Sequence, residues 1–189
     1  MSKTVRLAVV MICAIFVAQI ASAQSKVKKT ATEPTVFNEN EGAYGDAPDP
    51  FDDPVPLPDN VLDALRASEQ AKSMLDELKG LNREEFAKLF RAVKIHLSGP
   101  KELDYVVLGG FPMGGTDAPW FWIVRFDQTH PNVIFFTFAN GFEILKTRNN
   151  GYPNIRSNAF TASTRYTEIY HYNGQKYVLV HKYQKENTP

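Results

Sequence analysis

The chain has 189 residues, and its 21 lysines and arginines are balanced by 21 aspartates and glutamates. A nucleic-acid-binding domain normally carries a basic face, so this balance gives no support to DNA or RNA as a partner. The single cysteine, Cys13, lies near the N-terminus, and the rest of the chain can therefore form no disulfide and no thiolate metal site. The length suffices for one ordinary hydrophobic core.

The N-terminus has the three parts of a secretory signal peptide. Lys3 and Arg6 give a basic start, residues 7–20 are apolar apart from one glutamine, and small residues lead up to Ala23. The apolar run is shorter than the roughly 20 residues that a membrane-spanning helix needs. We therefore expect residues 1–23 to be removed before Gln24. The protein is then secreted or periplasmic and has no stable membrane anchor.

Residues 24–58 combine repeated prolines with a cluster of aspartates, and their few apolar residues show no period. Such a segment buries too little apolar surface to offset the entropy lost on ordering. The aspartates lack the ligand spacing of an EF-hand, so we expect no calcium site. The pattern predicts a disordered, acidic, proline-rich linker over 24–58.

Residues 59–98 show helical spacing of apolar side chains. Asp59 is a good N-cap for a first helix, and Gly80 is a natural end for it. Asn82 and Glu85 have the spacing of a capping box that begins a second helix. The apolar stripe of that second helix consists of Phe86, Leu89, Phe90, Val93 and Leu97. A short turn between the two helices predicts an antiparallel helical hairpin.

From residue 103 the pattern changes to strands separated by turn residues. The expected strands are 103–109, 120–126, 133–138, 142–148, 155–160, 165–172 and 176–182. Short connections imply an antiparallel meander. Asn173-Gly174, between two alternating runs, predicts a hairpin with a type I′ turn.

The expected fold is α+β. It consists of an N-terminal helical hairpin followed by a curved antiparallel sheet or small open barrel of about six to seven strands. A single domain covers 59–184, with helices over 59–98 and the β meander over 103–184; residues 185–189 form a tail.

Two of the expected strands, 120–126 and 133–138, are apolar on both faces. A strand of this kind must be covered twice. We expect the helices to cover one face, and a curled sheet or a partner to cover the other.

No nucleotide or metal motif is present. The glycine-rich stretch 109–115 lacks the Lys-Ser or Lys-Thr pair of a phosphate-binding loop and leads into a strand, so it is interpreted as a flexible connection. No histidine has helical metal-ligand spacing. The sequence predicts no cofactor, neither NAD nor ATP, and no metal.

One polar pair on the last hairpin is a candidate for acid–base chemistry. A turn at Asn173-Gly174 places His181 opposite Tyr166 and on the same face as Glu168, while His171 lies on the other face. Glu168 could then orient His181 as a general base. A structural cross-strand pair is the other interpretation, and no serine or cysteine nucleophile accompanies the two residues.

The strongest binding candidates are aromatic. One face of the last hairpin carries a row of tyrosines, and the strand at 120–126 adds two tryptophans. The candidate residues are Tyr166, Tyr170, Tyr172, Tyr177, Trp120 and Trp122. An exposed tyrosine row would form a platform for sugar rings or for a protein; a buried one would be a core ladder.

Three stretches, 120–125, 150–155 and 170–177, resemble small secreted bacterial proteins of unknown function. In that group a tryptophan-bearing strand, a Gly-x-x-Asp-Ile turn and a closing Tyr-x-Phe-Asp-Gly-x-x-Tyr hairpin recur. Here Asn154 stands where the aspartate is usual, and Tyr172-Asn173 replaces Phe-Asp. The resemblance implies a secreted or envelope β-rich domain and supplies no catalytic residues.

These observations favour an exported, non-enzymatic binding or interaction module of the cell envelope, with an envelope protein or polysaccharide as its partner. One alternative is a periplasmic hydrolase that uses Glu168 and His181. Another is a subunit of an envelope assembly that residues 24–58 tether.

Overall fold

The computed structural model describes residues 35–38, 49–114, 118–126 and 130–186. The expected signal peptide and most of the expected linker lie outside these ranges, as does most of the expected tail. Within the ranges, no helix has both the length and the apolar character needed to cross a membrane.

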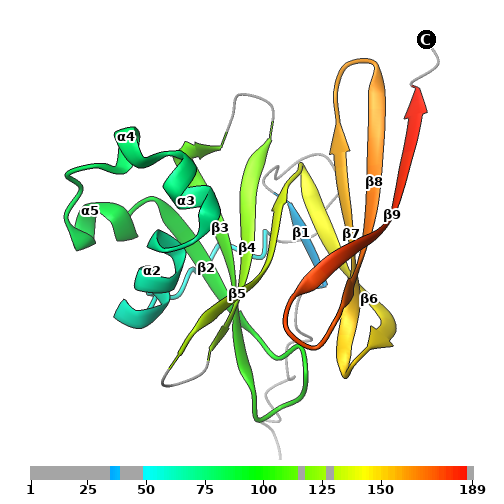
Figure 1. The fold of residues 1–189 in the computed structure, drawn as a ribbon, viewed down its shortest axis with the longest axis horizontal. Helices are drawn as coiled ribbons and strands as arrows, with labels where there is room; N and C mark the ends of the chain where they lie inside the picture. The colour runs from blue at the N-terminus through cyan, green and yellow to red at the C-terminus, as the bar shows by residue number, and fades with distance from the viewer. Residues whose placement is uncertain (1–34, 39–48, 115–117, 127–129, 187–189) are drawn as a thin grey trace, which may run out of the picture. The chain divides into compact units, whose positions relative to one another are not determined.

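Two antiparallel sheets make up most of the structure (Figure 1). The four-stranded sheet has the order β2 (Phe90–Ile95), β3 (Leu103–Gly114), β4 (Pro119–Phe126), β5 (Asn132–Phe138). The five-stranded sheet has the order β1 (Val36–Asn38), β6 (Gly141–Asn149), β7 (Tyr152–Phe160), β8 (Thr164–Tyr172), β9 (Tyr177–Glu186). The expected antiparallel strands are confirmed. The glycine-rich stretch, expected to be a connection, belongs to β3 as far as Gly114.

The expected helical hairpin is wrong. The second helix, α5 (Arg83–Ala87), begins with the predicted capping box of Asn82 and Glu85 but ends after little more than one turn. The chain continues as β2, in which Phe90 pairs with Gly109 and Ile95 with Asp104. The spacing of the apolar stripe fits a helix, but alternate side chains of β2 can also be buried, and backbone pairing with β3 decides for the strand.

The first expected helix is broken into three short ones: α2 (Asp59–Arg66), α3 (Glu69–Ser73) and α4 (Leu75–Leu78). Ser68 causes one of the breaks. Its side chain accepts a hydrogen bond from the backbone N–H of Ala71 at 3.2 Å and caps α3. Serine competes with helical hydrogen bonding in this way, and it therefore favours a cap over a helix interior.

β4 separates two apolar cores. Trp122 is fully buried in the core between the four-stranded sheet and the helices. Phe121 and Ile123 point the other way, into a core that also contains Phe142 and Ile155 of the five-stranded sheet. Burial of each side chain of this size stabilises the folded state by about 1.5 to 3 kcal/mol, because its apolar surface is removed from water. The helices cover one face of β4 as expected, and the second sheet covers the other.

Two phenylalanines show that the described parts of 24–58 pack against the folded domain. Phe37 in β1 and Phe51 are both buried in the core between the sheets. The Phe37 ring stacks on Phe142 with ring centroids 4.9 Å apart, and β1 pairs with β6. Isolated phenylalanines leave no periodic signal, yet each can fill a space between the sheets.

A type I′ turn, at Asn150-Gly151, joins β6 to β7. Asn150 and Gly151 have φ values of 48° and 83°, and they lie between the paired residues Asn149 and Tyr152. A type I′ turn requires positive φ at both central positions, and asparagine followed by glycine tolerates this best.

The predicted type I′ turn at Asn173-Gly174 is wrong. Of these two residues only Gly174 has positive φ, at 102°. The loop covers residues 173–176, because Tyr172 pairs with Tyr177. The Asn173 side chain accepts a hydrogen bond from the backbone N–H of Lys176 at 2.9 Å, which holds the longer loop.

Candidate functional site

Most of the tyrosine row is a core ladder. Tyr172 and Tyr177 are buried between the sheets, and half-buried Tyr170 packs against Phe135 with ring centroids 5.1 Å apart. Trp122 is buried below the helices. These side chains cannot form the exposed platform considered for them, because other parts of the chain already cover their rings.

The buried tyrosines form one end of the space between the sheets, which we call the closed end. Arg125 donates a hydrogen bond of 2.8 Å to the Tyr172 hydroxyl, and the Tyr177 hydroxyl donates one of 2.8 Å to the Pro153 carbonyl. Burial raises the pKa of Tyr177 above its ordinary value. The Tyr177 hydroxyl is thus a neutral donor to a carbonyl of β7 in its own sheet, whereas the Arg125–Tyr172 hydrogen bond joins the two sheets.

Asp104 lies buried near the closed end and has 0% exposure. One carboxylate oxygen accepts the Leu97 N–H at 3.2 Å, and the other has no hydrogen-bond partner in the described chain. Burial raises the pKa of Asp104 to about 6, although the Leu97 hydrogen bond acts in the opposite direction. Asp104 does not line the mouth cleft, and we do not assign it a ligand.

Glu168 and His181 do not form the expected pair. An irregularity in the β8–β9 register places His181 opposite Ile169 and Lys182 opposite Glu168. Since opposed residues share a face, Glu168 and His181 point to opposite sides of the sheet. His181 shares the outer face with His171, contrary to the expected separation of these histidines.

Glu168 belongs instead to a cleft at the other end of the space between the sheets. This mouth cleft has a volume of about 280 Å³. Its lining residues are Ala118, Phe138, Asn140, Ser157, Ala159, Phe160, Thr161, Tyr166, Glu168 and Lys182. The β7–β8–β9 register places Ser157, Ala159, Tyr166, Glu168 and Lys182 on the inner face of the sheet.

Hydrogen bonds fix the polar side chains of the mouth cleft. Lys182 lies 2.8 Å from one Glu168 oxygen, and the Tyr170 hydroxyl donates to the other at 2.5 Å. Burial alone would raise the pKa of Glu168, but the bonds from Lys182 and Tyr170 outweigh it and lower the pKa. Glu168 is thus a carboxylate at neutral pH. Deeper in, the Ser157 and Thr137 hydroxyls are 2.8 Å apart.

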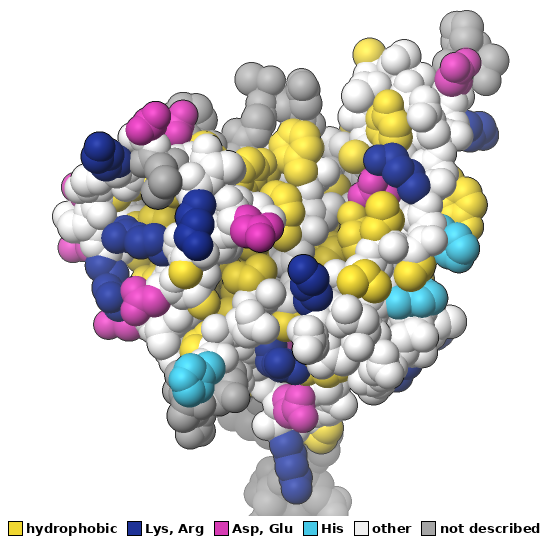
Figure 2. Space-filling view, viewed as in Figure 1, with side chains coloured by type: hydrophobic (Ala, Val, Ile, Leu, Met, Phe, Trp, Pro, Cys, Tyr) yellow, Lys and Arg dark blue, Asp and Glu magenta, His cyan; other side chains and the backbone are white. Residues whose placement is uncertain are grey.

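Exposed apolar side chains gather at the cleft and on β9. Phe138 and Phe160 line the cleft and are 47% and 36% exposed. Leu179, Val180 and Tyr183 are exposed along β9, the edge strand of its sheet. Figure 2 shows hydrophobic side chains on the face where β8 and β9 lie. Exposed apolar side chains beside a cleft are one feature of interaction sites.

Of the residues singled out from the sequence, only Tyr166 and Glu168 line the mouth cleft. Phe138, Phe160 and Lys182 were missed, because strand ends show no periodicity that separates a lining residue from an ordinary surface residue. The described chain contains no group of three or more side chains suited to hold a metal ion. Comparisons with family models, curated proteins and solved structures found no significant match, so the site has to be interpreted from this chain's own residues.

Proposed function

We propose that the protein is a non-enzymatic interaction module that works outside the cytoplasm. On this proposal it binds an extended segment of a partner protein along β9 and the neighbouring mouth cleft. Export depends on the signal peptide expected at residues 1–23, and the partner is a protein of the cell envelope.

The observation that carries the proposal is the character of β9 (Tyr177–Glu186). It is a long edge strand that pairs only with β8 among the described residues, and it carries exposed Leu179 and Tyr183. A free edge offers backbone N–H and C=O groups to an added strand, and alternate side chains of that strand then enter neighbouring pockets. The mouth cleft is such a pocket, since Lys182 of β9 forms part of its lining.

Charge indicates which segment would fit. Lys182 and Lys185 lie on β9, and no residue in the described ranges forms an ion pair with Lys185. An extended segment that alternates apolar and acidic side chains would complement this edge. A polysaccharide finds less support, because Tyr172 and Tyr177 of the expected platform are buried. The alternative of a hydrolase also loses support, because Glu168 and His181, its expected catalytic pair, point to opposite faces of the sheet.

The test measures binding of a defined library of extended peptides to the full chain by fluorescence polarisation. The proposal expects acidic–apolar peptides to bind, and Leu179→Asp to remove binding by placing a carboxylate on the free edge. Val36→Asp is the matched control, since Val36 and Leu179 are both 48% exposed and lie on opposite edges of one sheet.

Binding that survives Leu179→Asp, or that Val36→Asp weakens equally, would place the interaction elsewhere. The absence of binding by any peptide at millimolar concentration would overturn the proposal. Amide chemical shifts that move along β9 on peptide addition would locate the contact independently of either variant.

A further inference from the structure

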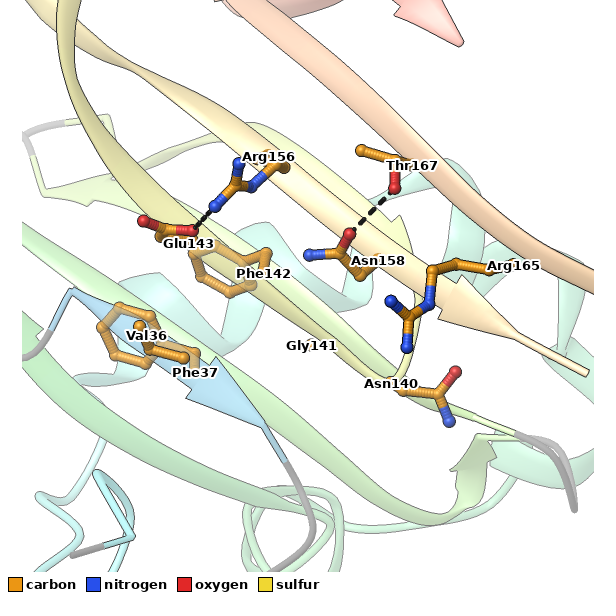
Figure 3. A pocket seen from close by; sticks show the side chains of 10 residues that line it. All are labelled: Val36, Phe37, Asn140, Gly141, Phe142, Glu143, Arg156, Asn158, Arg165 and Thr167. Atoms are coloured by element: carbon orange, nitrogen blue, oxygen red, sulfur yellow. Dashed lines mark hydrogen bonds and ion pairs between the residues drawn. The ribbon is translucent and has the colours of Figure 1, made fainter. Parts of the chain in front are cut away.

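A second cavity lies on the outer face of the five-stranded sheet, opposite to the face that forms the mouth cleft (Figure 3). This outer pocket has a volume of about 420 Å³, and β1, β6, β7 and β8 contribute to its lining. The side chains that matter chemically are Glu143, Arg156, Asn158, Arg165 and Thr167. Neither the tyrosine row nor the proposed peptide site uses any of them.

Arg165 is an exposed cation in the lining of the outer pocket. Its side chain extends toward the cavity from β8, and no residue in the described ranges forms a hydrogen bond or ion pair with its guanidinium (Figure 3). Its cross-strand partner is Lys185, another cation without a carboxylate partner in the described chain. Like charges directly opposite each other destabilise a sheet, and a bound anion would relieve that repulsion.

The other polar groups of the outer pocket leave donors for a ligand. Asn158 accepts a hydrogen bond from the Thr167 hydroxyl at 3.0 Å through its side-chain oxygen, so its amide N–H₂ is left as a donor. The one carboxylate, Glu143, is already paired with Arg156. The pocket therefore contains two arginines and one neutralised acid, and its net charge is positive.

Gly141 is part of the lining of the outer pocket. It pairs with Asn158, so any side chain at position 141 would point to the same face as Asn158 and into the cavity. Its φ is not among the positive values in the described chain. The backbone at position 141 therefore does not require glycine for its conformation.

We propose that the outer pocket binds an oxyanion, with Arg165 as its cationic partner and the Asn158 amide as a second donor. Guanidinium forms paired hydrogen bonds with carboxylate, phosphate or sulfate oxygens, and the flanking amide narrows the orientation. Exposed Val36 lines the β1 side of the pocket next to Glu143, and this apolar part of the lining favours an anion carried on a small organic molecule over a bare ion.

The experiment titrates the full chain separately with inorganic phosphate, sulfate, acetate and benzoate at constant ionic strength. The readouts are the NMR shifts of the Asn158 side-chain amide and the Arg165 Nε–H. The proposal expects saturable shifts at both groups, with a loss of affinity of about tenfold or more in Arg165→Gln. Gly141→Val should also weaken binding, because its side chain would extend into the cavity without changing any charge.

Lys94→Gln is the matched control, since it removes one positive charge from an exposed site on the other sheet. An unchanged affinity in Lys94→Gln, with the folded spectrum kept in all variants, supports a specific site. Tighter binding of benzoate than of acetate identifies a carboxylate beside an apolar group; saturation by phosphate or sulfate alone identifies a phosphorylated or sulfated ligand. Shifts that do not saturate with any of the four anions, or an equal weakening in Lys94→Gln, would overturn the proposal.

Discussion

Strands β7, β8 and β9 line both ends of the space between the sheets, but they close the two ends to different degrees. At the closed end, the inner face presents Ile155 and the large rings of Tyr172 and Tyr177. At the mouth cleft, the same rows continue with small or charged side chains such as Ala159 and Lys182. Side-chain volume, rather than backbone topology, therefore decides which end is filled and which can accept a ligand.

The largest expected effect is at the closed end. Tyr177→Ala should lower the free energy of unfolding by about 3 to 5 kcal/mol, because it removes a buried ring and leaves a cavity. Tyr166→Ala, at the mouth cleft, should cost less than about 1 kcal/mol, because its ring is only half-buried. Urea denaturation of both variants measures the difference. Equal losses would mean that the two ends are packed equally well.

Asp104 gives the next largest effect through pH. Its pKa is about 6 in the folded protein, against an ordinary value of 3.8, so the folded state holds the proton more tightly than the unfolded chain does. The contribution of Asp104 to the free energy of unfolding is therefore greatest below pH 4 and falls as pH rises. Above pH 6 about 3 kcal/mol of it has been lost. Asp104→Asn should remove that decline, as unfolding measured at pH 5 and pH 7.5 would show. A decline that persists unchanged in the variant would assign it to another group.

The strands from β3 to β9 could be predicted from the sequence. Alternation and turn residues indicated β3 to β9, because those signals are local. The helical hairpin could not be predicted correctly, since the apolar spacing from Phe86 to Leu97 fits a helix and a strand alike. Tertiary pairing of β2 with β3 decided between them.

The candidate site was less predictable, because it depends on register. Assuming a two-residue turn at Asn173-Gly174 placed Glu168 beside His181. The observed loop and the irregularity in β8–β9 pair Glu168 with Lys182 instead. A slip of one residue reverses which face a side chain occupies, and nothing local in the sequence reveals it.

A smaller effect is expected at the turn that joins β6 to β7. Asn150 has a φ of 48°, and its side chain donates a hydrogen bond of 2.8 Å to the Tyr172 carbonyl at the closed end. Asn150→Ala should cost about 1 to 2 kcal/mol through both the backbone conformation and the lost bond. Asn150→Gly keeps the conformation and should cost less. Urea denaturation measures the free energy of unfolding of both variants. If Asn150→Gly loses as much as Asn150→Ala, the lost hydrogen bond alone accounts for the destabilisation.

The smallest effect is expected at the mouth cleft. The Lys182 side chain is 54% exposed, so Lys182→Gln should change the stability at pH 7 by less than about 0.5 kcal/mol.

The larger consequence of Lys182→Gln is a change in the titration of Glu168. Without Lys182 the pKa of Glu168 should rise toward or above its ordinary value of 4.5, because burial then acts with less opposition. A carboxylate with a lowered folded pKa stabilises the protein above its unfolded pKa, and this contribution is lost as pH falls through the folded pKa. Lys182→Gln should therefore weaken the acid-side loss of stability that comes from Glu168. The NMR titration of Glu168 in both proteins measures this shift, and an unchanged pKa would show that the Tyr170 hydroxyl, which is held on the inner face, is sufficient to keep the cleft's carboxylate ionised.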